Sequence, residues 1–108
     1  MFFSIIIPVF NRPDEIRELL ASICAQDFRD FEVIVIEDGS TIKADLVCKA
    51  FEVLIPIRYF FQPNSGQGFA RNFGMKRASG EFFIILDSDV ILPKEYLTTV
   101  FQALTFRK

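Results

Sequence analysis

The sequence predicts an α/β fold in which an open parallel sheet of four strands carries helices on both faces. Short apolar runs rich in β-branched residues alternate four times with segments of helical periodicity. Each apolar run ends in a polar or glycine-containing loop. Alternation of this kind requires right-handed crossovers and therefore parallel strands. With 108 residues, 51% of them hydrophobic, the chain suffices for one domain over residues 1–108.

Four runs of β-branched and aromatic residues predict the strands, at residues 3–9, 31–36, 57–61 and 82–86. The last run, Phe82–Leu86, has no polar side chain, so we expect a strand that is buried on both faces of the sheet. Pro8 cannot donate a backbone hydrogen bond, and we expect the first strand to end near it.

Helices are predicted at residues 13–24, 44–51 and 67–78, and from residue 93 onward, because apolar residues recur there at helical spacing. Asn11 is expected to cap the first helix, with Pro13 in its first turn. Gly80 is expected in the C′ position of the third helix, and Pro93 is expected to begin the last one.

Charge and cysteine content restrict the partners and the compartment. The net charge is -2 and the basic residues are scattered, which predicts no nucleic-acid partner. Cys24 and Cys48 lack metal-ligand spacing and are predicted to be buried free thiols of a reducing compartment. The apolar run at residues 2–10 lacks the features of a signal peptide. We expect a cytoplasmic protein, with attachment to the inner face of a membrane left open.

Polar clusters follow every predicted strand. They are Asn11–Arg12, Glu37–Ser40, Asn64–Gly68 and Asp87–Asp89. In a doubly wound, Rossmann-like sheet, ligands bind outside the carboxyl ends of the strands, where strand order reverses. We therefore expect the four loops to form one cleft.

The last cluster places two carboxylates, Asp87 and Asp89, one residue apart. Such carboxylates repel each other and raise each other's pKa unless a cation lies between them. Hard oxygen ligands suit Mg²⁺ or Mn²⁺, particularly when substrate phosphates complete the coordination shell. The alternative interpretation of Asp89 is a cap for the last helix.

Asp38 and Arg71 are further candidate site residues. Asp38 precedes a tight Gly39–Ser40 turn and could read the donor edge of a nucleobase, or it could cap the second helix. Arg71 lies in the first turns of the third helix and could pair with a pyrophosphate. The alternative for Arg71 is a solvated surface side chain.

The segments Ser4–Arg12, Phe31–Ser40, Asn64–Glu81 and Leu86–Asp89 together resemble the family 2 glycosyltransferases of GT-A fold. Motif content, order and spacing agree from the first strand to the last helix. The resemblance implies the N-terminal, donor-binding half of a GT-A domain. It also implies a nucleotide-diphospho-sugar donor, a divalent Mn²⁺ or Mg²⁺ ion, and inversion at the anomeric carbon.

The resemblance also implies roles for individual residues. Asp38 would hydrogen-bond the base, usually uracil, and Arg71 would lie near the diphosphate. Asp89, in the Asp-x-Asp (DxD) motif, would bind the metal. Glu37 stands where the family often has a second aspartate. The nucleotide-binding residues implied in this way are Pro8, Asn11, Asp38, Arg71 and Asp87.

The general base of the family comes from the acceptor-binding half, after the Asp-x-Asp segment. Glu95 is the only acid beyond Asp89 and does not match the place of that base. We therefore expect no catalytic residue in this chain, a general base beyond Lys108, and a truncated donor-binding half that is inactive alone. Its apolar surface is expected to favour homo-oligomers.

The resemblance implies an enzyme of polysaccharide biosynthesis that uses a UDP-sugar and an acceptor glycan or lipid-linked sugar. The alternative is a non-catalytic module that binds a nucleotide or sugar nucleotide at the same edge. A phospho-acceptor domain would instead carry an acid pair at Asn11–Arg12. A nicotinamide-binding domain would need Gly-x-Gly-x-x-Gly after the first strand.

Overall fold

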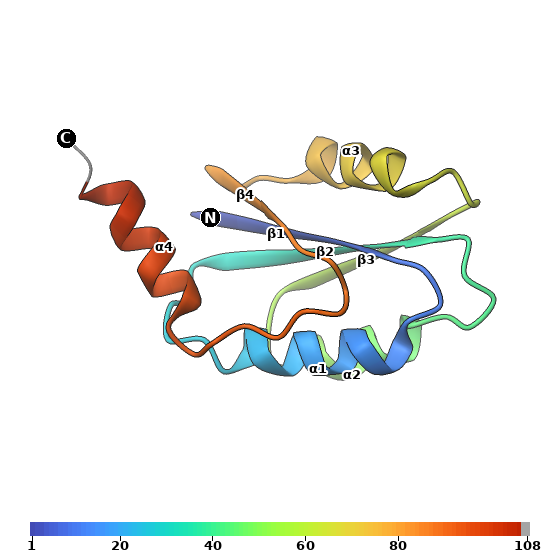
Figure 1. Ribbon diagram of the computed structural model, residues 1–108, viewed down its shortest axis with the longest axis horizontal. Helices are drawn as coiled ribbons and strands as arrows, with labels where there is room; N and C mark the ends of the chain where they lie inside the picture. The colour runs from blue at the N-terminus through green and yellow to red at the C-terminus, as the bar shows by residue number, and fades with distance from the viewer. Residues whose placement is uncertain (107–108) are drawn as a thin grey trace.

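A four-stranded parallel sheet lies at the centre of the computed structural model, which describes residues 1–106 (Figure 1). The spatial order is β3-β2-β1-β4. The chain therefore adds β2 and β3 on one side of β1 and returns to place β4 on the other side, so strand order reverses at β1. The predicted open parallel sheet is confirmed. Its strands are β1 (Phe3–Val9), β2 (Phe31–Asp38), β3 (Ile57–Gln62) and β4 (Phe82–Ile85).

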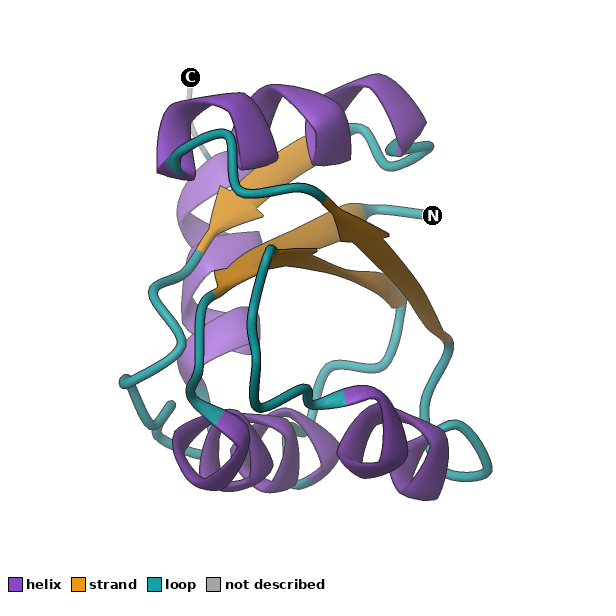
Figure 2. Ribbon diagram, turned by 90° about the vertical axis from the view of Figure 1, so that its right-hand side faces the viewer, coloured by secondary structure: helices purple, strands orange, loops and turns teal. Residues whose placement is uncertain are grey.

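Helices cover both faces of the sheet, as predicted (Figures 1 and 2). The helices α1 (Pro13–Cys24) and α2 (Asp45–Phe51) lie on one face, and α3 (Gln67–Arg77) lies on the other. The last helix, α4 (Tyr96–Thr105), lies near the amino ends of the strands (Figure 1). The loops that follow β1, β2 and β3 are thus at the opposite end of the sheet from α4.

Two apolar clusters fix these layers, because successive side chains of a strand point to opposite faces. Ile5 and Ile7 of β1 belong to the large cluster beneath the sheet, together with the buried side chains of α1 and α2. Ile6 belongs to a smaller cluster that also contains Ile34 and Ala70 of α3. The central strands β1 and β2 are buried along their whole length.

The last strand differs from its prediction. β4 pairs only with β1, and α3 packs over β1 and β2 instead of over β4. Phe82, Phe83 and Ile85 are therefore 39%, 45% and 40% exposed. The expectation of a strand buried on both faces is wrong for the described residues, because apolar composition does not reveal which neighbour covers a strand.

Of the two proline-based boundaries, one agrees with its prediction and one differs. β1 ends at Val9, one residue after Pro8, as expected. The missing N–H of Pro8 points to the β4 side of the strand, past Ile6, where pairing with β4 ends. The last helix does not begin at Pro93. Residues 93–95 form a turn in which the N–H of Tyr96 donates to the carbonyl of Pro93 at 3.0 Å, and α4 starts at Tyr96.

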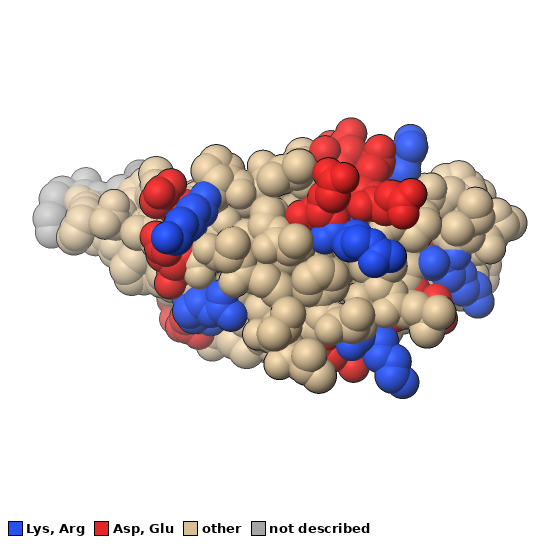
Figure 3. Space-filling view, turned by 90° about the horizontal axis from the view of Figure 1, so that it is seen from below, with Lys and Arg blue, Asp and Glu red and all other residues tan. Residues whose placement is uncertain are grey.

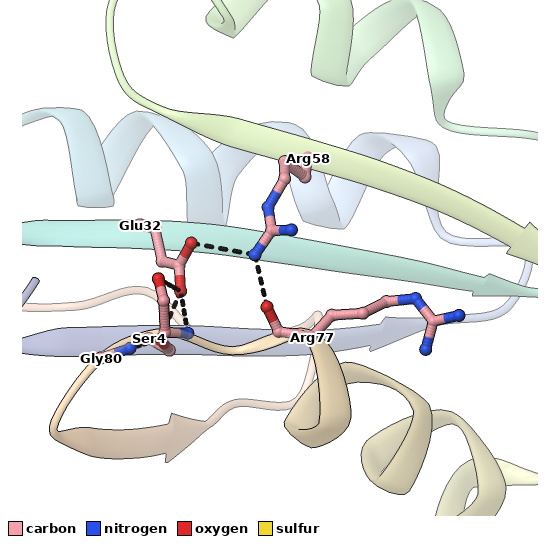
Figure 4. A network of polar contacts seen from close by, with 6 residues as sticks. Ser4, Glu32, Arg58, Arg77 and Gly80 are labelled. Carbon is pink, nitrogen blue, oxygen red and sulfur yellow. Dashed lines mark hydrogen bonds and ion pairs between the residues drawn. The ribbon is translucent and has the colours of Figure 1, made fainter.

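A buried polar network fastens the connection between α3 and β4 to the sheet (Figure 4). The Glu32 carboxylate accepts hydrogen bonds from Ser4 Oγ at 2.6 Å and from an Arg58 NH₂ group at 3.0 Å. The same Arg58 group donates to the carbonyl of Arg77, the last residue of α3, at 2.6 Å. Burial alone would raise the pKa of Glu32, but the hydrogen bonds from Ser4 and Ser79 and the charge of Arg58 outweigh it and lower the pKa.

Gly80 belongs to this network and does not close α3. The C-cap residue of α3 is Ala78, in an extended conformation, so the predicted C′ position for Gly80 is wrong. The N–H of Gly80 donates to Ser4 Oγ at 2.8 Å, and an added Cβ would lie 2.7 Å from the Ser4 nitrogen. A glycine is needed here because the chain passes directly against β1.

Candidate functional site

A cleft of about 380 Å³ opens at the carboxyl edge of the sheet, where strand order reverses. Residues from all four loops line it, so the predicted convergence of these loops is confirmed. Parallel strands end at the same edge, and β1 and β4 lie side by side. The lining residues are Pro8, Val9, Phe10, Arg12, Asp38, Asn64, Gln67 and Ser88.

Asp38 is the most firmly held acidic residue of the cleft. Its side chain is 6% exposed and accepts backbone hydrogen bonds from Ser65 at 2.8 Å and Gly66 at 2.9 Å, and a side-chain bond from Gln62 Nε2 at 3.1 Å. The end of β2 is thereby tied to the loop that leads into α3. The alternative in which Asp38 caps the second helix is wrong, because the N-cap residue of α2 is Ala44.

Glu37 has a structural role that the sequence did not reveal. The side chain is fully buried, and its Oε1 accepts from the backbone N–H of Ala44 and from the hydroxyl of Tyr59, both at 2.7 Å. Ser40 Oγ donates to Oε2. Burial first, and then the hydrogen bond and charge of Glu37, raise the pKa of Tyr59, which keeps its hydroxyl protonated as a donor. Glu37 thus shapes the loop after β2 that adjoins Asp38.

Asn11 connects two loops of the cleft edge. Its backbone has a positive φ of 53°, and its Oδ1 accepts hydrogen bonds from the backbone N–H groups of Thr41 and Ile42, both at 2.9 Å. The expected cap of the first helix is wrong, since the N-cap residue of α1 is Arg12 and has no side-chain cap. The cleft is lined by its neighbours Phe10 and Arg12, so a nucleoside contact of Asn11 remains a prediction.

Gln67 lies between two of the predicted site residues. Its Nε2 donates to Asp87 Oδ1 at 3.4 Å, and its Oε1 accepts from an Arg71 NH₂ group at 3.2 Å. Gln67 lines the cleft, whereas Arg71 and Asp87 are held beside it through this amide. The sequence signal was the spacing of four residues between Gln67 and Arg71 on one helix face.

Asp89 is exposed and lies in a turn directly after Ser88, which lines the cleft. The capping alternative for Asp89 is wrong, because the N-cap residue of α4 is Glu95 and has no side-chain cap bond. Within residues 1–106 no cluster of three or more metal-ligating side chains exists. Exposed carboxylates at Asp87 and Asp89 still fit a cation such as Mg²⁺, which needs only one or two of them when phosphates and water supply the other oxygens.

The surface is of mixed charge. Figure 3 shows the face that α1 and α2 cover, with acidic and basic side chains next to one another and no continuous basic field. Among residues 1–106, no helix has the length and apolar character that spanning a membrane requires.

The fold and the position of the cleft define the class of α/β domains that bind ligands at the point where a parallel sheet reverses its strand order. Within this class, residues 4–108 match glycosyl transferase family 2, and the chain belongs to that family. The resemblance inferred from the sequence is confirmed.

Similar proteins include glycosyltransferase GlyA of Streptococcus pneumoniae serotype 4, which is 35% identical over 92% of this chain and 14% of GlyA. The poly(ribitol-phosphate) β-N-acetylglucosaminyltransferase TarS of Staphylococcus aureus is 38% identical over 90% of this chain and 18% of TarS. The chain therefore spans less than a fifth of either relative.

Solved structures agree with the N-terminal part of the GT-A fold. TarS in complex with UDP-GlcNAc has a TM-score of 0.93 at 35% identity, covering 97% of this chain and 31% of that one. The mannosyltransferase PcManGT from Pyrobaculum calidifontis, in complex with GDP-Man and Mn²⁺, has a TM-score of 0.79 at 27% identity, covering 84% of this chain and 28% of that one.

Proposed function

We propose that residues 1–108 are the donor-binding part of an inverting glycosyltransferase that transfers a sugar from a nucleotide-diphospho-sugar to an acceptor hydroxyl. The observation that carries this proposal is the cleft, which four loops line at the carboxyl edge of the sheet in a chain of glycosyl transferase family 2. Its volume of about 380 Å³ is within the range of small-molecule sites. The complexes of TarS with UDP-GlcNAc and of PcManGT with GDP-Man support a nucleotide-sugar donor.

The nucleoside is proposed to lie between Pro8 and Asp38, which both line the cleft. Three N–H donors hold the Asp38 carboxylate, so it offers a fixed acceptor to a base without reorganisation on binding. Asn11 supports this end of the cleft by joining the loops after β1 and β2. A uracil base is proposed here, and the complex of TarS with UDP-GlcNAc supports this choice of base.

The diphosphate and ribose are proposed to bind at the side where Gln67 holds Arg71 and Asp87. Arg71 offers a guanidinium that can pair with phosphate oxygens. Asp87, at the end of β4, is placed to accept hydrogen bonds from a ribose or sugar hydroxyl. Both side chains are held by one amide, so donor binding can recruit them together.

Asp89 is the proposed ligand of a divalent cation, Mn²⁺ or Mg²⁺. Its carboxylate is exposed beside the cleft and has no hydrogen bond to another side chain within residues 1–106. Such a cation, when bound, supplies the Lewis acidity that stabilises negative charge on the departing nucleoside diphosphate. The PcManGT complex, which contains Mn²⁺, supports this choice of metal.

The residues that bind the acceptor, and the residue that acts as general base, are proposed to lie outside this chain. Glu95, the only acid after Asp89, is at the start of α4, at the other end of the sheet from the cleft (Figure 1). A base must come within hydrogen-bond reach of the acceptor hydroxyl, which that position does not allow. The proposed acceptor is a glycan or a lipid-linked sugar of polysaccharide biosynthesis.

Calorimetry with this chain tests donor binding. UDP is expected to bind more tightly in the presence of Mn²⁺ than in its absence, and an absence of binding by every nucleoside diphosphate with Mn²⁺ would contradict the proposal.

In a complete transferase that contains this chain, Asp89→Ala is expected to lower activity by about 100-fold. The matched control is Asp14→Ala, an exposed acid in the first turn of α1. Equal effects of the two substitutions would refute the metal assignment.

A further inference from the structure

Gln62 is a buried amide whose geometry the proposed function does not yet use. It is the last residue of β3, lies opposite Asp38 in the ladder between β2 and β3, and is 5% exposed. Its Nε2 donates to Asp38 Oδ1 at 3.1 Å. Its Oε1 is buried and has no hydrogen-bond partner within residues 1–106. The amide nitrogen of Gln62, and not its amide oxygen, must face Asp38, since Gln62 Oε1 and Asp38 Oδ1 would repel each other at that distance.

The hydrogen bonds of Asp38 leave little acceptor capacity for a ligand. An ionised carboxylate offers about four lone-pair sites, two on each oxygen. Oδ1 accepts from Gln62 Nε2 and from the Ser65 N–H, so both of its sites are occupied. Oδ2 accepts only from the Gly66 N–H within the described residues. One acceptor site therefore remains on Asp38, on Oδ2.

We propose that Gln62 determines the base specificity of the cleft, by restricting Asp38 to a single further donor and so selecting a base with one imide N–H. This inference rests on the proposed function, because it requires that the base of the donor faces Asp38. Gln62 does not contact the base in this proposal. It acts through the carboxylate and is a positioning residue.

The donor patterns of the bases explain the selection. Uracil presents one imide N–H between two carbonyl groups, which matches one free acceptor site. Guanine presents an imide N–H and an adjacent amino group, and its second donor would meet Oδ1, where both sites are filled. A donor left without an acceptor on burial is unfavourable. Adenine and cytosine place a ring-nitrogen lone pair beside their amino group, and this lone pair would be repelled by the carboxylate.

The remaining atoms of uracil also fit this arrangement. Its carbonyl oxygens carry partial negative charge, so they are best placed near the better neutralised half of the carboxylate. Oδ1 is that half, because two N–H groups point at it, while Oδ2 receives one. Without the Gln62 amide, the two oxygens of Asp38 would each have one free site, the arrangement that two adjacent donors need.

The first experiment uses the unmodified chain and calorimetry with Mn²⁺ and the nucleoside diphosphates UDP, GDP and inosine diphosphate. UDP is expected to bind about tenfold more tightly than GDP, the size of effect expected when one buried donor of the base is left without an acceptor. Inosine diphosphate lacks the amino group of GDP and keeps its imide N–H, so it is expected to bind more tightly than GDP. Equal binding of GDP and inosine diphosphate, or a preference for GDP over UDP, would overturn the inference.

The second experiment replaces the amide. Gln62→Met keeps the length of the side chain without a donor, and Gln62→Ala also leaves space beside Oδ1. Both remove a buried acceptor that has no partner, so neither loses a fully satisfied group. The preference for UDP over GDP is expected to fall at least about threefold in one or both variants, mainly through tighter GDP binding, which a merely structural role would not produce.

The matched control is Gln102→Leu, an exposed glutamine of α4 at the other end of the sheet, which is expected to leave the UDP to GDP ratio unchanged. Circular dichroism verifies that each variant is folded. If neither Gln62 variant folds, the affinities of the unmodified chain for GDP and for inosine diphosphate decide whether the inference stands. An unchanged ratio in folded variants that still bind UDP would overturn the role of Gln62 and leave the proposed function standing. Failure of the unmodified chain to bind any nucleotide would overturn both.

Discussion

Gly39 offers a sharp test of how the cleft is built, because at this residue the loop that follows Asp38 and β2 packs against the loop that carries Asn64. Its φ is +72°, and an ideal Cβ would lie 2.6 Å from the backbone nitrogen of Asn64 and 2.7 Å from its Cα. These are backbone atoms, which cannot move aside as the end of a flexible side chain can. Asp38 and Asn64 both line the cleft, so Gly39→Ala must either strain this contact or separate the two loops.

Two costs add at this position. A left-handed conformation costs a non-glycine residue about 1–2 kcal/mol, and forcing an extra methyl group into a filled space costs about 1–3 kcal/mol. The expected loss is therefore about 2–5 kcal/mol, together with weaker UDP binding. Urea unfolding followed by circular dichroism measures the free energy of unfolding, and calorimetry measures binding.

Gly68→Ala is the matched control for this substitution. Gly68 lies in α3, its φ is not positive, and an added Cβ would meet no atom within 4 Å. Alanine is expected there to stabilise the helix by up to about 1 kcal/mol. A Gly39→Ala variant that unfolds within about 1 kcal/mol of the unmodified chain and binds UDP equally well would refute the close approach of the two loops.

Three further outcomes follow from the buried polar groups. The pKa of Glu32 is lowered on folding from its usual 4.5, so its contribution to stability is present above that pH and is lost as the pH falls below it. Glu32→Gln should remove this part of the pH dependence of the free energy of unfolding, measured by urea unfolding at several pH values. An unchanged pH dependence would contradict the role of the Glu32 carboxylate. Burial and the charge of Glu37 raise the pKa of Cys48 to about 12, so iodoacetamide should label this thiol only after unfolding, and rapid labelling of the folded chain would contradict the packing of α2. Tyr59→Phe removes a hydrogen-bond donor to Glu37 and should lower the free energy of unfolding by about 1–2 kcal/mol. An unchanged urea midpoint would show that this hydrogen bond does not stabilise the fold.

The sequence predicted the order and type of the elements because these follow from local periodicity. β1 and β2 are buried along their whole length, and the apolar runs from which they were predicted suit that burial. The exposure of β4 could not be predicted in the same way, since Phe82 and Phe83 have the composition of a buried strand and only tertiary packing reveals that they stay 39% and 45% exposed.

The cleft was predictable as a meeting of four loops, but the partners of its side chains were not. Asn11 and Asp38 have the residue types of helix caps, and both instead bind backbone groups of a loop far away in sequence. A polar side chain has several partners of similar energy, and long-range packing decides among them. For the same reason the sequence did not indicate that Gln62 would bind Asp38 or that Gln67 would reach Asp87.

Joint binding of a nucleoside diphosphate at Asp38 and a cation at Asp89 is tested most directly by NMR of the ¹⁵N-labelled chain with UDP. The amide signals of Ser65 and Gly66, which donate to Asp38, are expected to shift, and Mn²⁺ is expected to broaden signals around Asp89 first. The amides of Ser79 and Gly80, in the network around Glu32 and Ser4, are expected to stay unchanged. Shifts centred on Ser79 and Gly80, with none at Ser65 and Gly66, would contradict a donor site in the cleft.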